Sequence, residues 1–351
     1  MVSLKSDPVY AVTKAYGFKS FLLAPTALEE LSYAKNLNDF VEILRPTHYG
    51  VFLSQLQRPY SSAEVEKALW KGLVEHHFKL IETTLRPELL RQLFMRYVHF
   101  NVKSVLKSKA LGKPPDEILK HIDLFPETLL GVRDQTLKAL NTKDLTEFLG
   151  EYVETPLSET LKTAVDVLNE KRDFSAVDAV IDKQYHENLF KVFRKISRGE
   201  RKLLEPFMFL ELDVKAVATA LRARFWGLLP SQVKNFLPSQ TVSLDVKLLS
   251  SIVEAEEIGK ALEQLPENGI FDKIKGERNI TTVLSALEES AKRQKISWAY
   301  KSFYRTPFRQ TVLVAYLVLK ETETKNLATI AKYIEEGVTD ISMIRSSLSV
   351  P

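Results

Sequence analysis

Phe94 to Gly112 reads FMRYVHFNVKSVLKSKALG, and this helical stretch occurs twice more in the chain. The second copy, Phe209 to Gly227, reads FLELDVKAVATALRARFWG, and the third, Leu319 to Gly337, reads LKETETKNLATIAKYIEEG. The copies align without a gap, and their final glycines lie 115 and then 110 residues apart. A repeat of this length, with no catalytic motif beside it, predicts a pseudo-symmetric helical protein rather than an enzyme built around one cleft.

The similarity among the copies is mainly a shared pattern of apolar positions. Within each copy these positions are spaced i, i+3 and i+4, which places them on one face of an α-helix. The three apolar columns are Val102, Val217 and Leu327, then Val105, Ala220 and Ile330, then Leu106, Leu221 and Ala331. We therefore expect this face to be buried in each copy.

Each copy then ends in the same way. A basic column follows the apolar face, where the stem of a long cation can still pack on apolar neighbours, and a glycine suits the left-handed position after a helix. Chance similarity among helices of like composition is the alternative. The shared glycine, the basic column and a further apolar column downstream argue against it. The basic column is Lys107, Arg222 and Lys332. The glycines are Gly112, Gly227 and Gly337, followed in two copies by Pro114 and Pro230. The downstream apolar column is Ile118, Val233 and Met343.

Composition narrows the class of protein. The chain has 351 residues, enough for two or three core-sized units, with 45% hydrophobic and 27% charged residues. It has no cysteine, which excludes disulfides and thiolate chemistry, and its net charge of +4 is mild. Met1 to Gly17 lacks the apolar core of a signal peptide. The most apolar run, Thr311 to Leu319, is too short to span a membrane and predicts a buried helix.

Helical patterns cover most of the chain, and no sustained apolar–polar alternation predicts a strand. The fold class expected is all-α. Ser61 to Glu64 resembles a capping box that opens a long helix to about Thr84. Thr322 is expected to cap the third repeat helix. The remaining long helices are expected from Pro87 to Leu111, Leu157 to Lys171, Ala176 to Ile196, Lys202 to Trp226 (with Pro206 near its start), Thr281 to Gln294, and Pro307 onward, with a short last helix from Thr339 to about Leu348.

No motif for catalysis or for cofactor binding is present. The chain has no P-loop, GxGxxG, GxSxG or HExxH sequence. The six histidines (His48, His76, His77, His99, His121 and His186) lack metal-ligand spacing and are interpreted as surface or structural residues, and the three tryptophans (Trp70, Trp226 and Trp298) as core residues. We therefore predict no catalytic, cofactor-binding or metal-binding residue.

Charge is unevenly distributed. Lys191 to Lys234 holds ten basic and four acidic residues, and Lys292 to Arg309 holds six basic residues and no acid. Glu254 to Glu289 carries nine acids against four bases. One interpretation is a set of solvated helix faces. The other is a set of docking surfaces of alternating sign, which would steer association with charged partners.

Several segments resemble one known family. Pro8 to Leu23 (PVYAVTKAYGFKSFLL), Tyr97 to Gly112, Leu210 to Gly227 and Pro307 to Leu348 resemble the C subunit of archaeal and bacterial V/A-type rotary ATPases, which is related to the d subunit of the eukaryotic vacuolar ATPase. The resemblance covers nearly the whole chain in order. Its most specific part is the C-terminal region, where Pro307-Phe308 precedes an apolar helix, then the Lys320-Glu321 pair and then an Asn326-Leu327 helix.

The resemblance implies both an architecture and a role. It implies a funnel of three similar helical bundles about a pseudo-threefold axis. The first bundle is residues 1–90 completed by 306–351, the second is 91–205 and the third is 206–305. It implies a non-catalytic subunit that caps the membrane rotor ring and holds the central stalk, so that rotation couples ATP hydrolysis or synthesis to proton or sodium transport. The implied partners are central-stalk subunits and the proteolipid ring. No cofactor and no nucleic acid are implied, and membrane contact occurs only through the ring, as a peripheral protein on the cytoplasmic face of the cell membrane.

The chain departs from the family pattern at two places, and other classes of function stay open. Ala216 stands where the family often has Asn, which puts a side-chain hydrogen bond there in doubt, and Leu228-Leu229 replace a Gly-rich acidic turn. One alternative is a helical-repeat scaffold that binds protein, or nucleic acid through stacking aromatics such as Phe303, Tyr304 and Phe308. Another is an enzyme with an unfamiliar site, marked by buried carboxylates of perturbed pKa.

Overall fold

The structure is a computed structural model that describes residues 8–171, 174–229, 233 and 236–349. These residues form helices and connecting turns without a strand, so the predicted all-α class is confirmed. The chain divides into two compact units, Met1–Leu90 with Lys292–Pro351, and Arg91–Ala291. The division into three bundles, with its pseudo-threefold axis, stays a prediction. Pro230 and Lys234 lie outside the described residues.

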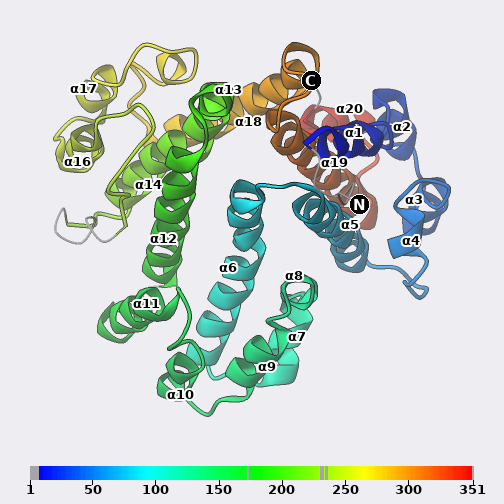
Figure 1. The fold of residues 1–351 in the computed structure, drawn as a ribbon, viewed down its shortest axis with the longest axis horizontal. Coiled ribbons are helices and arrows are strands. Elements are labelled where there is room, and N and C mark those ends of the chain that lie inside the picture. The colour runs from blue at the N-terminus through cyan, green and yellow to red at the C-terminus, as the bar shows by residue number, and fades with distance from the viewer. Residues whose placement is uncertain (1–7, 172–173, 230–232, 234–235, 350–351) are drawn as a thin grey trace. The chain divides into compact units, whose positions relative to one another are not determined.

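The first unit combines the two ends of the chain. Its C-terminal helix α19 packs against α5 and α1 (Figure 1). The Ser61 capping box at the start of α5 is present as predicted, with Glu64 bonded back to the Ser61 backbone. The helices of this unit are α1 (Pro8–Lys19), α2 (Pro25–Leu31), α3 (Leu37–Leu44), α4 (Gly50–Leu53), α5 (Ser62–Thr83), α19 (Thr311–Glu335) and α20 (Ile341–Ser347).

The second unit holds the first two repeat copies. Helices α11 and α12 pack together, as do α14 and α16. Two long helices, α6 (Glu88–Ala110) and α18 (Ile280–Arg305), contribute residues to both units. The other elements are α7 (Pro115–His121), α8 (Phe125–Leu130), α9 (Arg133–Asn141), α10 (Leu145–Gly150), α11 (Ser158–Lys171), α12 (Phe174–Lys195), α13 (Arg198–Met208), the π-helical turn η2 (Phe209–Asp213), α14 (Val214–Phe225), α16 (Val246–Glu254), α17 (Ile258–Glu263) and the 3-10 turn η3 (Phe271–Lys273).

The repeat pattern predicts the buried face of three helices correctly. All nine residues of the apolar columns are fully buried, on α6, α14 and α19. Gly112, Gly227 and Gly337 have φ values of 70°, 66° and 70°, the left-handed conformation that glycine adopts without steric cost. The N–H of the residue after each glycine donates to the carbonyl five residues earlier, as in Lys113 to Ser108, so each helix ends in a Schellman motif.

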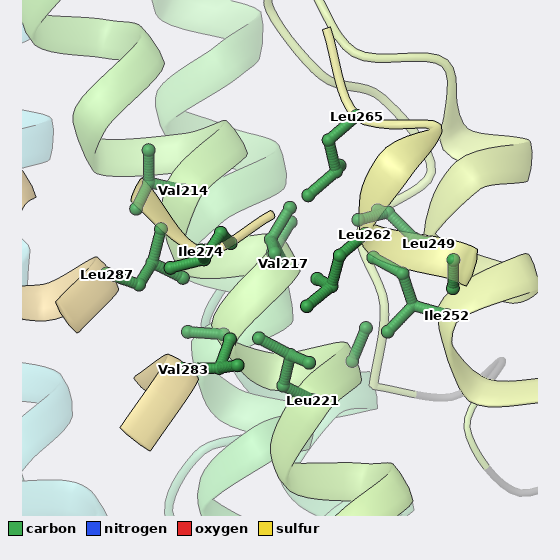
Figure 2. Packing of buried hydrophobic residues seen from close by; sticks show 14 of the residues in the cluster. Val214, Val217, Leu221, Leu249, Ile252, Leu262, Leu265, Ile274, Val283 and Leu287 are labelled. Carbon is green, nitrogen blue, oxygen red and sulfur yellow. The ribbon is translucent and has the colours of Figure 1, made fainter. Parts of the chain in front are cut away.

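Three apolar clusters contain these repeat helices. In the first unit, Leu327, Ile330 and Ala331 pack with residues of α2, α3 and α5. In the second unit, one cluster joins α6 to α11 and α12. A further cluster packs Val217 and Leu221 against residues of α16, α17 and the start of α18 (Figure 2). Burial of each such side chain contributes roughly 1.5–3 kcal/mol, so the clusters, rather than helix propensity, hold the helices in place.

The boundaries of several helices differ from the prediction. Thr322 caps no helix, because α19 is continuous and the Thr322 hydroxyl donates to the Val318 carbonyl at 2.8 Å. Helix α18 does not end near Gln294 but continues to Arg305. Helix α13 begins at Arg198, so Pro206 lies inside its last turns rather than near its start, and a π-helical turn follows. Proline has no N–H to donate, and irregular turns accommodate such losses.

The downstream apolar column is only partly correct. Ile118 and Val233 are buried, but Met343 is 49% exposed and Ile344 takes the buried place beside the first core. Helix α20 is capped by Asp340, whose carboxylate accepts from the N–H groups of Ser342 and Met343. This cap fixes the rotation of a short helix, and the rotation turns Ile344 inward. Trp226, expected in a core, is 52% exposed.

Candidate functional site

The densest cluster of ionisable groups lies in the first unit, where α19 changes from apolar to polar. Thr311 to Leu319 is buried throughout, as predicted for this run. Lys320 follows and is fully buried, and Glu323 is 6% exposed. These two residues are three apart on one helix face, and Lys320 Nζ lies 3.2 Å from Glu323 Oε1. The buried ion pair is thus Lys320 with Glu323, whereas Glu321, next to Lys320 in the sequence, pairs with Lys325 at 2.8 Å.

Groups from the N-terminal part of the chain complete this cluster. The Tyr49 hydroxyl donates to Glu323 Oε1 at 2.5 Å, and the Leu23 N–H donates to Glu323 Oε2 at 2.5 Å. Lys320 Nζ lies 3.7 Å from the centroid of the Tyr49 ring and also contacts His48 Nε2. Residues nearly 300 positions apart in sequence therefore share one hydrogen-bonded network. It fastens the N-terminal segment to the C-terminal helix.

The electrostatics of this network favour one buried ion pair. Burial lowers the pKa of Lys320 to about 8, with Glu323 acting in the opposite direction, so the amine still carries its proton at neutral pH. Burial, and then the charge of Lys320, lowers the pKa of His48 to about 3, so this imidazole is neutral and accepts from Lys320. Burial raises the pKa of Tyr49 well above its usual value. A buried ion pair persists when further hydrogen bonds compensate its lost hydration, and this one has them.

Two more histidines are held inside the same unit. His76 Nδ1 lies 2.5 Å from the Tyr316 hydroxyl, and the ring of Phe18 stacks on His76 at 4.2 Å. Burial lowers the pKa of His76 to about 3. His77 Nε2 lies 2.9 Å from the Leu90 carbonyl. In the part of the chain that the structure describes, no group of three His, Asp or Glu side chains is arranged to hold a metal ion.

A second set of buried polar groups anchors the segments that follow the repeat helices. Asn101 and Asn326 occupy the same repeat column. Asn101 Nδ2 donates to the Asp123 carbonyl at 2.7 Å, and Asn326 Nδ2 donates to the Ser349 carbonyl at 2.8 Å. Both bonds reach a segment just over twenty residues downstream. The column therefore fastens each chain continuation to its repeat helix.

The second copy uses a different anchor. Ala216 occupies the Asn column and packs in the apolar cluster instead, so the doubted side-chain hydrogen bond is absent at this residue. Asp213, three residues earlier and fully buried, accepts from the N–H groups of Val242, Ser243 and Leu244 at 2.6–3.0 Å. Asp213 and Glu323 share a repeat column, and both carboxylates accept backbone N–H groups from a distant loop. Two of the three aligned copies carry this acidic signal in the sequence, which our sequence analysis missed, whereas the first copy has Val98 in the column.

Glu127 is another buried carboxyl of the second unit. It is fully buried on α8, and the amide of Asn101 lies 2.9 and 3.0 Å from its two oxygens. Burial raises the pKa of Glu127 to about 7, because removal from water disfavours the charged form and one neutral donor compensates little. Buried carboxyls of perturbed pKa are the predicted sign of an enzyme with an unfamiliar site. Asp213 and Glu127, however, each bond to groups of the protein that hold a segment in place.

The predicted docking residues lie on the surface of the first unit. Lys301, Arg305 and Arg309 are exposed at the end of α18 and in the turn that follows. Tyr304 and Phe308, between them, are 76% and 77% exposed. Phe303 is buried, so two of the three aromatics proposed for stacking remain accessible.

The basic stretch from Lys191 to Lys234 is partly committed to the fold. Arg224 donates to the carbonyl of Glu256 at 2.9 Å, and Arg222 pairs with Glu288. In the basic column, Lys107 pairs with Asp178 at 2.9 Å and Lys332 with Glu335 at 3.1 Å. Such partly exposed ion pairs contribute little stability but fix side chains on the surface. Arg222 and Arg224 are therefore engaged within the fold.

Comparison with known proteins gives a consistent result. The model of the ATP synthase (C/AC39) subunit family matches residues 11–343. The C subunit of the A-type ATP synthase of Pyrococcus horikoshii is 27% identical over 338 residues, which cover 93% of this chain and 86% of that protein. The corresponding C subunit of Thermococcus onnurineus is 24% identical over 336 residues, which cover 94% of this chain and 87% of that protein. The C subunit of Methanosarcina acetivorans is 22% identical over 350 residues, which cover 98% of this chain and 93% of that protein. Among the described residues, no helix is long and apolar enough to cross a membrane.

Proposed function

Because the chain belongs to the ATP synthase (C/AC39) subunit family, we propose that it is a non-catalytic coupling subunit of a V/A-type ATP synthase or ATPase. In this role it caps the membrane rotor ring and holds the central stalk, so that rotation couples ATP synthesis or hydrolysis to ion transport. Its partners are the stalk subunits and the proteolipid ring. It acts as a peripheral protein on the cytoplasmic face of the cell membrane.

The observation that best supports this role is the way in which the chain ends are fastened together. A subunit that transmits torque must resist deformation. Helix α19 is buried against α5 and α1, and the Lys320–Glu323 network ties it to Leu23 and Tyr49. Buried hydrogen-bonded networks resist opening more than surface contacts do. We further propose that the three repeats form three bundles, 1–90 with 306–351, 91–205 and 206–305, around a pseudo-threefold axis.

The coupling role is tested by assembly. The tagged full chain is purified from gently solubilised native membranes, and its partners are identified by mass spectrometry. We expect the ring proteolipid together with stalk and head subunits of the ATPase. Reversal of Lys301, Arg305 and Arg309 to Glu should weaken this recovery without lowering the Tm, because all three side chains are exposed.

A control of equal charge makes this test specific. Lys35, Lys120 and Lys138 are also exposed, and their reversal to Glu changes the net charge by the same amount at other places. Equal loss of partners from both triple variants would show an unspecific charge effect. Recovery of the wild-type chain alone would contradict the coupling role.

The scaffold hypothesis predicts a different outcome. Tyr304 and Phe308 are exposed beside Lys301 and Arg305, which is the arrangement that stacks on single-stranded nucleic acid. If the chain is such a scaffold, it should bind single strands with a steep dependence on salt concentration and should be recovered without ATPase subunits.

A further inference from the structure

The C-terminal end of α18 carries an exposed surface of mixed aromatic and basic character. It consists of the exposed Lys301, Tyr304, Arg305 and Phe308, together with the half-buried Lys19 of α1, and we call it the α18 tip. Lys301, Tyr304 and Arg305 are spaced i, i+3 and i+4 and so lie on one side of α18, and Phe308 follows in the turn after the helix. Lys19 Nζ lies 5.0 Å from the centroid of the Tyr304 ring. About three quarters of each aromatic side chain is open to solvent.

Phe308 is exposed at a cost to the backbone. Its φ is 95°, and it is the one non-glycine residue with positive φ among those that the structure describes. This conformation is unfavourable for any residue with a Cβ, and in known structures such outliers concentrate where a segment contacts a ligand. At 77% exposure the ring gains little packing inside the protein that could offset the strain. This combination of strain and exposure points to a role for the ring in contact with a ligand.

The two sequence segments that form the α18 tip carry charge of one sign. Residues 292–309 contain six basic residues and no acid, and residues 8–28 contain Lys14 and Lys19 and no acid. The two segments are joined directly, because the Tyr16 hydroxyl donates to the Phe303 carbonyl at 2.6 Å and the two rings meet edge to face at 5.2 Å. Neither segment supplies a carboxylate to neutralise the tip. These two segments are therefore positively charged, which suits an anionic partner.

We propose that the α18 tip binds an anionic membrane surface directly. Tyr304 and Phe308 enter the boundary between headgroups and acyl chains, where amphipathic and aromatic side chains are favoured, and Lys19, Lys301 and Arg305 pair with lipid phosphates. The rings project from a helix end, so a deformable bilayer can accept them without a matching pocket. This contact is additional to the coupling role, in which the membrane is reached only through the ring.

Vesicle co-sedimentation of the purified full chain tests the proposal. The vesicles are pure phosphatidylcholine, or phosphatidylcholine with about one quarter phosphatidylserine, in about 0.1 M salt, at which charges are screened beyond about 10 Å. We expect binding to the anionic vesicles, loss of binding at high salt, and little binding to neutral vesicles. Each of Lys301→Glu and Arg305→Glu should weaken binding about fivefold or more.

Phe308→Gly is the most informative variant. Glycine tolerates the positive φ, so this change removes the ring and relieves the strain, and the Tm should stay equal or rise. Binding to anionic vesicles should nevertheless fall roughly tenfold, as expected for loss of one buried aromatic side chain. Phe100→Ala and Lys35→Glu are matched controls, since Phe100 is 58% exposed in the second unit and Lys35 is an exposed cation of the first. Neither should change binding.

Three results would overturn the proposal. They are absence of binding to anionic vesicles, equal binding of wild type and Phe308→Gly, and binding to soluble polyglutamate but not to vesicles, which would assign the α18 tip to an acidic protein. The outcome is separable from the coupling role. A chain that is recovered with ring and stalk but does not bind vesicles keeps that role and loses the lipid contact. A chain that binds vesicles but is recovered without ATPase subunits keeps the lipid contact and loses the coupling role.

Discussion

Replacing Glu127 by glutamine should make the protein more stable at alkaline pH and leave it almost unchanged at acidic pH. Glu127 is fully buried, and its carboxyl oxygens face the amide of Asn101, with Asp123 nearby. Glutamine has the shape of a protonated glutamic acid and never ionises. The variant therefore mimics the neutral form at every pH.

The expected magnitude follows from the raised pKa. The pKa of Glu127 rises from 4.5 to about 7 on folding. Between these values the folded state keeps a proton that the unfolded state releases. The stability contributed by the neutral carboxyl is therefore fully present below pH 4.5 and is lost as the pH rises through 7. The interval corresponds to about 3 kcal/mol. At pH 5 only about 1 kcal/mol of this is lost, so the difference between pH 5 and pH 8 is about 2 kcal/mol.

Urea unfolding of wild type and Glu127→Gln at pH 5 and pH 8, followed by far-UV circular dichroism, measures this difference. The comparison at each pH cancels the other titrating groups. Glu154→Gln, at an exposed position of the same unit, should show no such pH dependence relative to wild type. An equal stability difference at both pH values for Glu127→Gln would refute the argument, because it would mean that Glu127 ionises at the same pH in the folded and unfolded states.

Two further predictions concern the repeat and the ion pair. Gly227→Ala should destabilise the protein by about 1 kcal/mol in thermal or urea unfolding, because φ is positive and no atom lies near the added methyl group. Gly17→Ala, equally open but inside α1 with ordinary φ, should stabilise the protein by about 0.5–1 kcal/mol. A loss of stability in both variants would contradict the backbone explanation. Lys320→Met should cost about 3–5 kcal/mol by stranding Glu323, and adding Glu323→Gln should recover part of this loss. Additive losses in the double variant would show that the two side chains do not interact.

Local features of the fold were predictable because short-range chemistry decides them. The Ser61 capping box and the glycine after each repeat helix depend on hydrogen bonds within a few residues, and both are present. The apolar face of the repeat helices follows from their periodicity. The prediction failed at Thr322, where a helix start was expected, and near Gln294, where a helix end was expected. At Thr322 the packing of α19 against α5 and α1 outweighs the local preference.

The sequence by itself determined the all-α class, the repeat helices and their ends, and the absence of the familiar catalytic motifs. The tertiary structure alone decided which polar groups became buried partners. Glu323 meets Tyr49 and Leu23 across 274 and 300 residues, and Asp213 replaces the missing Asn of its repeat as an anchor. Desolvation and hydrogen bonding at such sites depend on segments that are far apart in the sequence and meet only in the folded chain. That is the physical reason why helix positions could be predicted and the buried network could not.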